Sequence, residues 1–356
     1  MAIETVKQPA VNLSIVIIAR NEAKNIARGI ESALRAVRHQ ATAEILLVDS
    51  ASSDATVEIA RQYPISIVRL PDDWFLSMGA GRLIGMQYTR GDLVLHMDGD
   101  MELDPDWVDR SVAYMQEHNE VGAVGGYYRN VFIKDGQVMG ERDVHRDASG
   151  RTQEVKYVGG AALYRRSAIE AIGGFQPYIR GEEGVYMSMG IRFAGYKVVQ
   201  LPYLMSKHYC VPPGSLEYSL RRLHLDMWLG FGQVPRYYLG TRMFWTYLNE
   251  RGSFIIYHLG VVMTLTTLLI AIFTKNIVVF GGWMLILAIF LSVFTVRKRS
   301  LRKTIVSLIG HTGIAISAIR GFLIAPRSSA EYPLDAEIVQ VAGQGGAGVI
   351  TLQDLP

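Results

Sequence analysis

Residues 13–22, LSIVIIARNE, form an apolar run that ends in polar residues. The run is short and rich in β-branched side chains, which is typical of a strand in the interior of a sheet. A polar, helix-like stretch from Glu22 to Arg38 follows it directly. A strand that leads into a helix is the opening unit of a doubly wound α/β fold.

The same alternation of apolar runs and helix-like stretches continues to about Pro213. It predicts further strands at residues 44–48, 65–70 and 92–97 and a second helix at residues 54–62. We therefore expect residues 1–213 to form one α/β domain with a mostly parallel sheet and flanking helices. In such sheets, ligands bind beyond the carboxyl ends of the strands.

Two aspartates separated by a glycine, Asp98 and Asp100, follow the strand predicted to end at Met97. Carboxylate oxygens are ligands that Mg²⁺ and Mn²⁺ prefer, and such an ion can carry a diphosphate. An Asp-x-Asp pair also occurs in ordinary solvated turns. Its place at the end of a strand in this sheet favours a metal site.

Polar residues also follow the first two strands. Asp49 ends the second strand, where a carboxylate can accept hydrogen bonds from a nucleobase or a ribose. Asp54 is sufficiently explained as a helix N-cap. The segment from Ala19 to Glu22 ends the first strand. Three successive strand ends are therefore expected to face one crevice.

A second region, residues 254–324, is suited to a membrane. Its segments 254–273 and 277–296 contain no Asp, Glu, Lys or Arg, and each approaches the ~20 residues needed to cross a bilayer. We interpret them as a transmembrane hairpin rather than as two buried core helices. A weaker third segment, residues 304–324, could span the membrane, re-enter it or lie in its interface. The glycine-rich residues 325–356 are expected to form a mobile tail.

Basic residues lie on both sides of this hairpin. They are Arg236, Arg242 and Arg251 before it and Arg297, Lys298, Arg299, Arg302 and Lys303 after it. The positive-inside rule places both flanks in the cytoplasm, and the N-terminus has no secretory signal. We expect an integral membrane protein, most simply of a prokaryotic plasma membrane, with a cytoplasmic catalytic domain. Residues 214–253 are expected to be an interfacial amphipathic linker.

Composition excludes several other classes of protein. The formal net charge of +3 over 356 residues gives no reason to expect a nucleic-acid partner. The single cysteine, Cys210, excludes an internal disulfide framework and a cysteine-rich zinc site.

From Leu13 to about Tyr209 the chain resembles the family 2 glycosyltransferases with the GT-A fold. The segments that carry the resemblance are, in chain order, residues 14–22, 48–49 with 52–56, 91–92 leading to 98–100, 159–166, 173–175, 181–183 and 194–196. The resemblance implies a nucleotide-sugar donor, a UDP-sugar in preference to a GDP-sugar.

The resemblance also implies roles for particular residues. Donor-binding positions would be Ala19, Arg20, Glu22, Asp49, Arg82 and Asp98. A divalent cofactor, Mg²⁺ or Mn²⁺, would be held by Asp100 with help from Asp98. His208 lies near where relatives supply a histidine to the metal or the diphosphate. The alternatives are a solvated helix arginine for Arg82 and a structural role for His208.

The catalytic base departs from the pattern of the family. An inverting enzyme needs a carboxylate that takes a proton from the acceptor hydroxyl. Family members place it in a Glu-Asp pair, and an ungapped count puts Glu183 on the glutamate and Gly184 on the aspartate. Either Glu183 or Glu182 takes the role, or the chain is impaired. We favour Glu183, against a solvated helix start stabilised by the helix dipole.

The sequence from Gln233 to Tyr237, QVPRY, resembles the Gln-x-x-Arg-Trp motif of membrane-bound processive sugar polymerases, with tyrosine in place of tryptophan. Arg236 could hold the departing diphosphate, and Gln233 could share in donor binding. The alternative is simple anchoring at the membrane interface.

Together these features predict a metal-dependent, inverting hexosyltransferase in polysaccharide or glycoconjugate synthesis. The acceptor would be a lipid-linked or membrane-proximal glycan, because a membrane tether raises the effective concentration of such an acceptor. A processive polysaccharide synthase is the alternative within the class. A non-catalytic glycan-assembly subunit that retains the donor fold is the alternative from another class.

Overall fold

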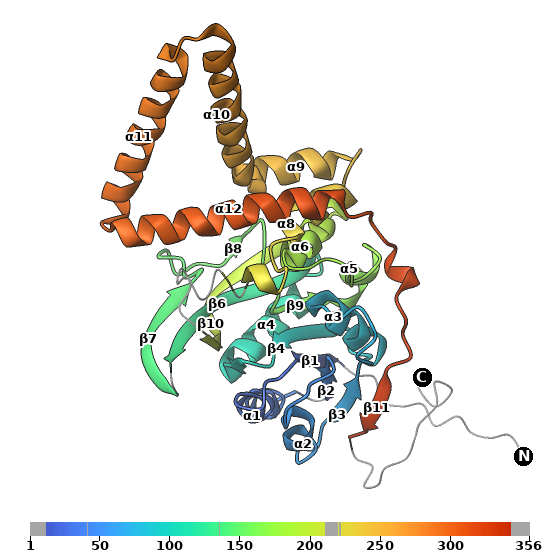
Figure 1. The fold of residues 1–356 in the computed structure, drawn as a ribbon. Coiled ribbons are helices and arrows are strands. Elements are labelled where there is room, and N and C mark those ends of the chain that lie inside the picture. Colours follow the sequence, from blue (N-terminus) through green and yellow to red (C-terminus); the bar gives the residue numbers. More distant parts are fainter. Residues whose placement is uncertain (1–11, 41, 135, 211–219, 221, 343–356) are drawn as a thin grey trace, which may run out of the picture. The chain divides into compact units, whose positions relative to one another are not determined.

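The computed structural model describes residues 12–342 apart from residues 41, 135, 211–219 and 221 (Figure 1). The described residues divide into two compact units. Residues 12–210 and 327–342 form the first, here named the sheet unit. Residues 220–326 form the second, here named the helical unit.

Four parallel strands lie side by side in the sheet unit, in the order β3-β2-β1-β4. They are β1 (Leu13–Ala19), β2 (Ala43–Asp49), β3 (Ser66–Arg69) and β4 (Leu93–Asp98), and the helices between them are α1 (Ile26–Ala36), α2 (Thr56–Ala60) and α3 (Met78–Gln87). Strand β1 has the predicted bounds, and all seven of its residues are buried. The α/β fold predicted from the sequence is confirmed.

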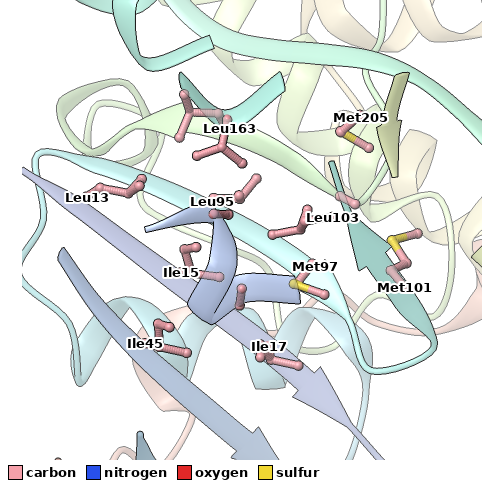
Figure 2. Packing of buried hydrophobic residues seen from close by; sticks show 14 of the residues in the cluster. Leu13, Ile15, Ile17, Ile45, Leu95, Met97, Met101, Leu103, Leu163 and Met205 are labelled. Atoms are coloured by element: carbon pink, nitrogen blue, oxygen red, sulfur yellow. The ribbon is translucent and has the colours of Figure 1, made fainter. Parts of the chain in front are cut away.

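Both faces of β1 are covered by helices. Ile15 and Ile17 pack in one cluster with residues of α1 and α4 (Pro105–Glu117), and Figure 2 shows them beside Leu95 and Met97 of β4. Val16 and Ile18 pack on the other face with residues of α3. Because both faces of β1 are buried, its residues form a continuous apolar run in the sequence.

The remainder of the sheet is largely antiparallel. Strand β9 (Ala162–Arg165) joins β4 to β6 (Val121–Lys134), and β6 pairs in parallel with β10 (Lys197–Cys210). The other elements of this half are β5 (Met101–Leu103), β7 (Gln137–Val144), β8 (Gln153–Glu154), α5 (Arg166–Glu170) and α6 (Glu183–Phe193). The sheet is therefore mixed, whereas the sequence predicted a mostly parallel one.

The segment after the apolar helices returns to the sheet. Strand β11 (Glu337–Gln340) pairs antiparallel with β3, with Ile338 opposite Val68. A 3-10 turn, η2 (Ser329–Glu331), precedes it. The prediction of a mobile tail over residues 325–356 is thus corrected for residues 327–342. Residues 343–356 of that prediction lie outside the described residues.

Tyr332 anchors this returning segment. Its ring is 3% exposed and lies edge-on to Trp74 and Tyr178, with ring centroids 5.5 and 5.7 Å away. Its hydroxyl donates a hydrogen bond to the carbonyl oxygen of Phe75 at 3.0 Å. The segment is therefore held by a buried aromatic side chain as well as by backbone pairing.

Tyr332→Ala is expected to lower the free energy of unfolding of the sheet unit by about 3–5 kcal/mol, the range for emptying a buried aromatic site. Tyr332→Phe, which loses one hydrogen bond, should cost about 0.5–1.5 kcal/mol. Thermal unfolding in detergent measures both. Leu334→Ala is the matched control, because Leu334 is 37% exposed on the same segment. Equal effects of Tyr332→Ala and Leu334→Ala would contradict the anchoring role.

The described residues of the helical unit are mostly helical. From Gly230 onward its elements are α8 (Gly230–Tyr237), α9 (Arg242–Arg251), the 3-10 turn η1 (Gly252–Phe254), α10 (Ile255–Thr274), α11 (Val278–Lys298) and α12 (Leu301–Leu323). Three helices of the described chain are long and apolar enough to cross a membrane, and they end in α10, α11 and α12. Their bounds lie within three residues of the three predicted segments.

Candidate active site

The carboxyl ends of β1, β2 and β4 meet at one edge of the sheet. In the register of the parallel strands, Ala19 lies opposite Asp49, and Ile18 lies opposite Asp98. The three polar strand ends predicted to share a crevice are therefore adjacent. Gly99 contributes to this arrangement, because a Cβ there would lie 2.9 Å from that of Ala19.

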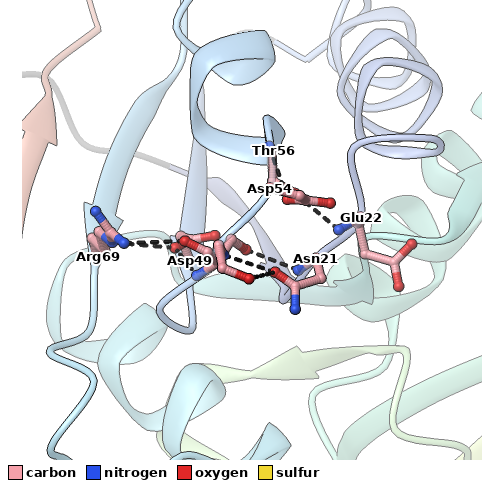
Figure 3. Close-up of polar contacts among 8 residues, drawn as sticks. Asn21, Glu22, Asp49, Asp54, Thr56 and Arg69 are labelled. Carbon is pink, nitrogen blue, oxygen red and sulfur yellow. Dashed lines mark hydrogen bonds and ion pairs between the residues drawn. The ribbon is translucent and has the colours of Figure 1, made fainter.

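The loops after β1 and β2 are joined by hydrogen bonds (Figure 3). The backbone N–H of Asn21 donates to Ser52 Oγ at 2.9 Å, and Asn21 Oδ1 accepts from the N–H of Ser53 at 2.8 Å. The N–H of Glu22 donates to Thr56 Oγ1 at 2.8 Å. Arg20, between them and β1, is exposed. Helix α1 consequently begins at Ile26 rather than at Glu22 as predicted.

Asp54 does not act as the N-cap that the sequence suggested, since that position is Ala55. Its carboxylate instead accepts from the N–H of Thr56 at 3.0 Å and from the N–H of Ala23 at 3.1 Å. Asp54 thus also joins the two loops and stabilises the edge of the crevice.

Asp49 is fully buried at the end of β2. Its Oδ2 accepts from the N–H of Ser52 at 2.9 Å and lies 3.7 Å from Arg69 Nε, while Oδ1 has no hydrogen-bond partner in the described part of the chain. Burial raises the pKa of Asp49, and the contacts with Ser52 and Arg69 oppose this rise. A buried oxygen of this kind is suited to accept a hydrogen bond from a ligand.

Arg82 lies at the centre of the site and is 1% exposed. Its Nη2 donates to Asp98 Oδ1 at 2.8 Å, and its Nη1 donates to Glu183 Oε1 at 2.9 Å. Burial acts against the charge, but the carboxylates of Asp98 and Glu183 raise the pKa of Arg82. One guanidinium thus holds the carboxylates of Asp98 and Glu183 side by side. The burial of Arg82 excludes the alternative of a solvated helix arginine.

Two glycines of the surrounding chain make room for Arg82. On α3, a Cβ at Gly81 would lie 3.0 Å from Ile18 Cγ2, so the helix backbone packs directly on β1. A Cβ at Gly160 would lie 2.7 Å from Arg82 Nη2, whereas one at Gly159 would approach its nearest neighbour, the carbonyl of Ala161, at only 3.8 Å. The Arg82 guanidinium can therefore occupy its observed position only because residue 160 is a glycine.

Two uncharged side chains, those of His96 and Tyr164, lie near Arg82. His96 of β4 is fully buried, its ring centroid is 4.7 Å from that of Phe175, and its nitrogens have no hydrogen-bond partner among the described residues. Burial, followed by the charges of Arg82 and Arg166, lowers the pKa of His96 well below its usual value. Tyr164 lies on the same side, and burial raises its pKa. Neither group competes for the carboxylates with Arg82.

His208 of β10 lies beside Asp100, and its suggested role as a ligand of the metal or the diphosphate stays a prediction. Its Nε2 is 3.3 Å from Asp100 Oδ2, and its Nδ1 is 2.9 Å from Asn130 Oδ1. Burial acts to lower the pKa of His208, but hydrogen bonds to Asp100 and Cys210 raise it to about 10. A positive charge at neutral pH thus neighbours Asp100.

The residues present suit a divalent ion that arrives with a diphosphate. The described residues contain no group of three or more His, Cys, Asp or Glu side chains placed to hold a metal. Mg²⁺, however, is commonly bound by one or two carboxylates together with substrate phosphates. Asp100 Oδ1 is buried and has no partner in the described part of the chain, so it fits such an ion better than Asp98, which is bound by Arg82.

The two candidate bases begin helix α6. Glu183 is 7% exposed and is fixed by Arg82, whereas Glu182 precedes the helix with a left-handed backbone (φ +59°). A Cβ at Gly184 would lie 3.1 Å from the backbone of Val158, Gly159 and Gly160. The chain is therefore tightly packed where the resembled family has an aspartate.

Gln233 and Arg236 belong to the helical unit and not to the sheet unit that holds the other candidate residues. They lie on α8, which packs on α12, where the Arg236 guanidinium is 5.7 Å from the ring centroid of Phe322. Their predicted part in donor binding stays a prediction.

Two residues of the site were missed from the sequence. Arg69, at the end of β3, faces Asp49, and Asn130 of β6 fixes the ring of His208. Arg69 carries a usable signal, because it is a basic residue at the end of a predicted strand. Asn130 carries none, because its strand was not predicted.

Comparisons with known proteins agree with this architecture. Residues 14–173 match the family described as glycosyl transferase family 2. Glycosyltransferase AglE of Haloferax volcanii is 25% identical over 251 residues, 63% of this chain and 82% of that protein. Dodecaprenyl-phosphate galacturonate synthase of Rhizobium johnstonii is 31% identical over 134 residues, 36% of this chain and 38% of that protein.

The fold is similar to that of solved structures, among them one of TarS. The crystal structure of S. aureus TarS residues 1–349 in complex with UDP has a TM-score of 0.50 at 12% sequence identity, and covers 94% of this chain and 98% of that one. The shared fold is of the GT-A type.

Proposed function

The chain belongs to glycosyl transferase family 2, and from this premise we propose that it transfers a sugar from a UDP-sugar to a lipid-linked or membrane-proximal glycan, with inversion at the anomeric carbon. The observation that carries the proposal is the shared guanidinium of Arg82, which holds Asp98 and Glu183 together at the strand ends beside Ala19 and Asp49.

The nucleotide would lie at the ends of β1 and β2. The buried Oδ1 of Asp49 would accept a hydrogen bond from the nucleobase, and Arg69 would keep the carboxylate in place. Ala19, Arg20 and Glu22 form the neighbouring wall. UDP is the nucleotide in the TarS complex of similar fold, which supports the choice of a uridine donor.

The diphosphate would lie over Asp100, with Mg²⁺ or Mn²⁺ held by Asp100 and assisted by Asp98 or, once its imidazolium had lost a proton to solvent, by His208. Such an ion neutralises the charge that develops on the leaving diphosphate. Arg82 keeps Asp98 oriented toward this position. His208, fixed by Asn130, completes the polar wall on the far side of Asp100.

Glu183 is the proposed base. The acceptor oxygen attacks the anomeric carbon, the bond from that carbon to the diphosphate breaks, and the hydroxyl proton passes to the Glu183 carboxylate. Arg82 holds this carboxylate beside Asp98, so proton acceptance and departure of the diphosphate would occur within one site. Glu182 is the alternative base.

A lipid-linked acceptor fits the apolar helices of the helical unit. The name of the Rhizobium johnstonii relative specifies a dodecaprenyl phosphate, and a polyprenyl phosphate is the acceptor class we propose to examine first. The motif of Gln233 and Arg236 favours a processive synthase, and Gly184 favours a non-catalytic subunit. Both remain outcomes of the experiment below.

The test is an assay of nucleotide release by the full chain in detergent. UDP- and GDP-sugars are supplied with Mg²⁺, Mn²⁺ or EDTA, and a membrane lipid extract serves as acceptor. We expect metal-dependent release with one UDP-sugar, transfer of label to the lipid phase, and loss of both in Asp100→Asn. Label in a long polymer identifies the processive synthase. No release from any donor supports the non-catalytic subunit.

Asp49→Asn is expected to weaken binding of UDP about 12–150-fold, which corresponds to the roughly 1.5–3 kcal/mol of one hydrogen bond to a charged group. Calorimetric titration with UDP measures it. Because burial raises the pKa of Asp49 above its unfolded value, stability falls as the pH rises from the unfolded pKa to the raised one, and the full cost of ionising Asp49 is present above the raised pKa. The variant should therefore melt no lower than the wild type at neutral pH, and its advantage should shrink as the pH falls. Weakened binding with a lower melting temperature would instead indicate local unfolding.

A further inference from the structure

The sheet unit is completed by residues from both sides of the helical unit. Strand β11 is hydrogen-bonded to β3, and Gln340 Nε2 donates to the carbonyl oxygen of Tyr63 at 2.8 Å. Residues before 211 and after 326 therefore belong to one folded body. A folded body cannot lie on both sides of a bilayer, so the chain between them must cross the membrane an even number of times.

Among the residues that the structure describes, three helices are long and apolar enough to cross, which is an odd number. Helix α12 differs from the other two. It is the least apolar of the three, and 28% of its most apolar window is buried within the protein, against 6% for the span that ends in α10 and none for α11. One of the three helices must therefore not cross the membrane, and composition indicates that this helix is α12.

We infer that α10 and α11 form the complete transmembrane region, and that α12 lies in the plane of the membrane interface, on the same side as the sheet unit, with one face in contact with lipid. This inference rests on the membrane attachment in the proposed function, but not on the reaction. The occupant of the exposed face is the headgroup and upper acyl layer of the bilayer.

The two faces of α12 are suited to this position. Small residues face the start of α8 and the two residues before it: a Cβ at Gly321 would collide with the carbonyl of Leu229, and one at Gly313 would collide with the ring of Trp228. The opposite face presents large apolar side chains between 43% and 78% exposed, namely Ile305, Ile309, Ile316, Ile319 and Leu323. Their spacing of three, four or seven residues aligns them on one side of a helix.

Contacts within the helical unit agree. Figure 1 shows α12 running across the open end of the hairpin formed by α10 and α11. It meets α10 near the beginning of that helix, where His258 Nε2 is 2.9 Å from the carbonyl oxygen of Ala315 and Tyr257 stacks on His311 at 4.9 Å. A third antiparallel span would instead pack along the length of its neighbours.

Charge gives an independent argument. The junction of α11 and α12 holds Arg297, Lys298, Arg299, Arg302 and Lys303. The positive-inside rule places this junction on the cytoplasmic side, with Arg242 and Arg251 before α10. Since β11 must return to the side of the sheet unit, α12 then begins and ends on one side of the membrane.

The proposal also sets the depth of α8. Gly232 of α8 packs so closely on α12 that a Cβ there would collide with the carbonyl of Ala318. Gln233 and Arg236 would therefore lie at headgroup depth, where the phosphate of a lipid-linked acceptor is found. An interfacial α12 thus holds the motif of Gln233 and Arg236 at the same depth in the membrane as the phosphate of the acceptor.

The first test is the accessibility of single cysteines to a membrane-impermeant maleimide, applied to intact spheroplasts and to inverted vesicles. Cys210 is replaced by serine, and single cysteines are placed at Ala148 in the sheet unit, Asn276 in the α10–α11 turn, Lys298 at the α11–α12 junction and Ala330 after α12. We expect Asn276→Cys to react from the outside and the other three to react from the cytoplasmic side.

Two other outcomes overturn the proposal and are distinguishable. Reaction of Ala330→Cys from the side opposite to Ala148→Cys means three crossings. Reaction of all four from the cytoplasmic side means that no helix crosses, which also removes the membrane span from the proposed function. Binding of UDP by each variant shows that the sheet unit is folded.

The second test measures depth in lipid nanodiscs with spin labels on α12 at Ile305, Ile309, Ile316 and Ile319. An interfacial helix gives one shallow depth at all four positions. A spanning α12 gives a depth that is greatest near its middle, as the matched labels at Leu259, Leu265 and Leu269 of α10 should show. The latter pattern on α12 contradicts the proposal.

Discussion

Glu183→Gln is expected to lower kcat about 10²–10⁴-fold, the contribution of general-base catalysis, with little change in the KM for the donor. Glutamine keeps the shape of the side chain and can still accept the hydrogen bond from Arg82 Nη1, but it cannot take the acceptor proton. The measurement is steady-state transfer to the acceptor, together with calorimetric binding of UDP, which should match the wild type.

Two variants control for this result. Glu182→Gln should retain activity within about tenfold, because Glu182 precedes the helix and is not the residue that Arg82 holds by Nη1. Gly184→Asp, which installs the acidic residue of the resembled family, should not raise the rate, because its Cβ would crowd the backbone at residues 158–160. Loss of activity in Glu182→Gln alone would move the base to Glu182.

Arg82→Met is expected to lower the free energy of unfolding by about 3–5 kcal/mol, the cost of leaving a buried charge without its partner. Methionine fills much of the space but leaves the carboxylate of Glu183 buried and unpaired, and it frees Asp98 to rotate. Transfer should also fall below detection. Thermal unfolding and the transfer assay measure the two effects.

A double variant separates charge from packing. Arg82→Met with Glu183→Gln should be more stable than Arg82→Met alone, because the buried unpaired charge is removed. If the double variant is no more stable, the loss comes from packing and not from the ion pair. The pair Gly160→Ala and Gly159→Ala tests the position of the guanidinium, since only a methyl group at residue 160 would displace Arg82. We expect the former alone to lower the rate, by up to about 10²-fold.

The parallel half of the fold follows from local sequence. Strand β1 was predicted with its observed bounds, because burial on both faces leaves a continuous apolar run from Leu13 to Ala19. Register then follows from the parallel pairing, so the adjacency of Asp49, Asp98 and the end of β1 could also be expected. The hairpin of α10 and α11 was predicted because its residues contain no charge over about 20 positions.

The rest of the fold depends on pairings between distant segments. Strand β11 is only four residues long. The side chain of its residue Gln340 donates a hydrogen bond to the carbonyl oxygen of Tyr63, which lies 277 positions earlier. The glycines that follow it indicated a mobile tail, and no local pattern reveals that Tyr332 fills a site lined by Trp74 and Tyr178. The long strands β6 and β10, which pair with each other in parallel, were likewise not predicted.

The site was predicted in its composition but not in its connections. Asp98, Asp100, Glu183 and His208 were all named from the sequence. The structure joins Asp98 and Glu183 through Arg82, and it places His208 beside Asp100. The Arg82 guanidinium binds both Asp98 and Glu183 because α3 packs closely on β1. The spacing of residues in the sequence does not specify this packing. A family pattern can name the residues of a site without stating which of them hold one another.

The pairing of β11 with β3 has a consequence for synthesis. A ribosome completes residues 13–210 long before it reaches Glu337, so β3 must remain an unpaired edge while the apolar helices are made and inserted. An open edge of this kind can pair wrongly with other chains during that interval. The pairing of β11 with β3 comes last, and in the proposed topology it requires that the two membrane spans have returned the chain to the side on which it began.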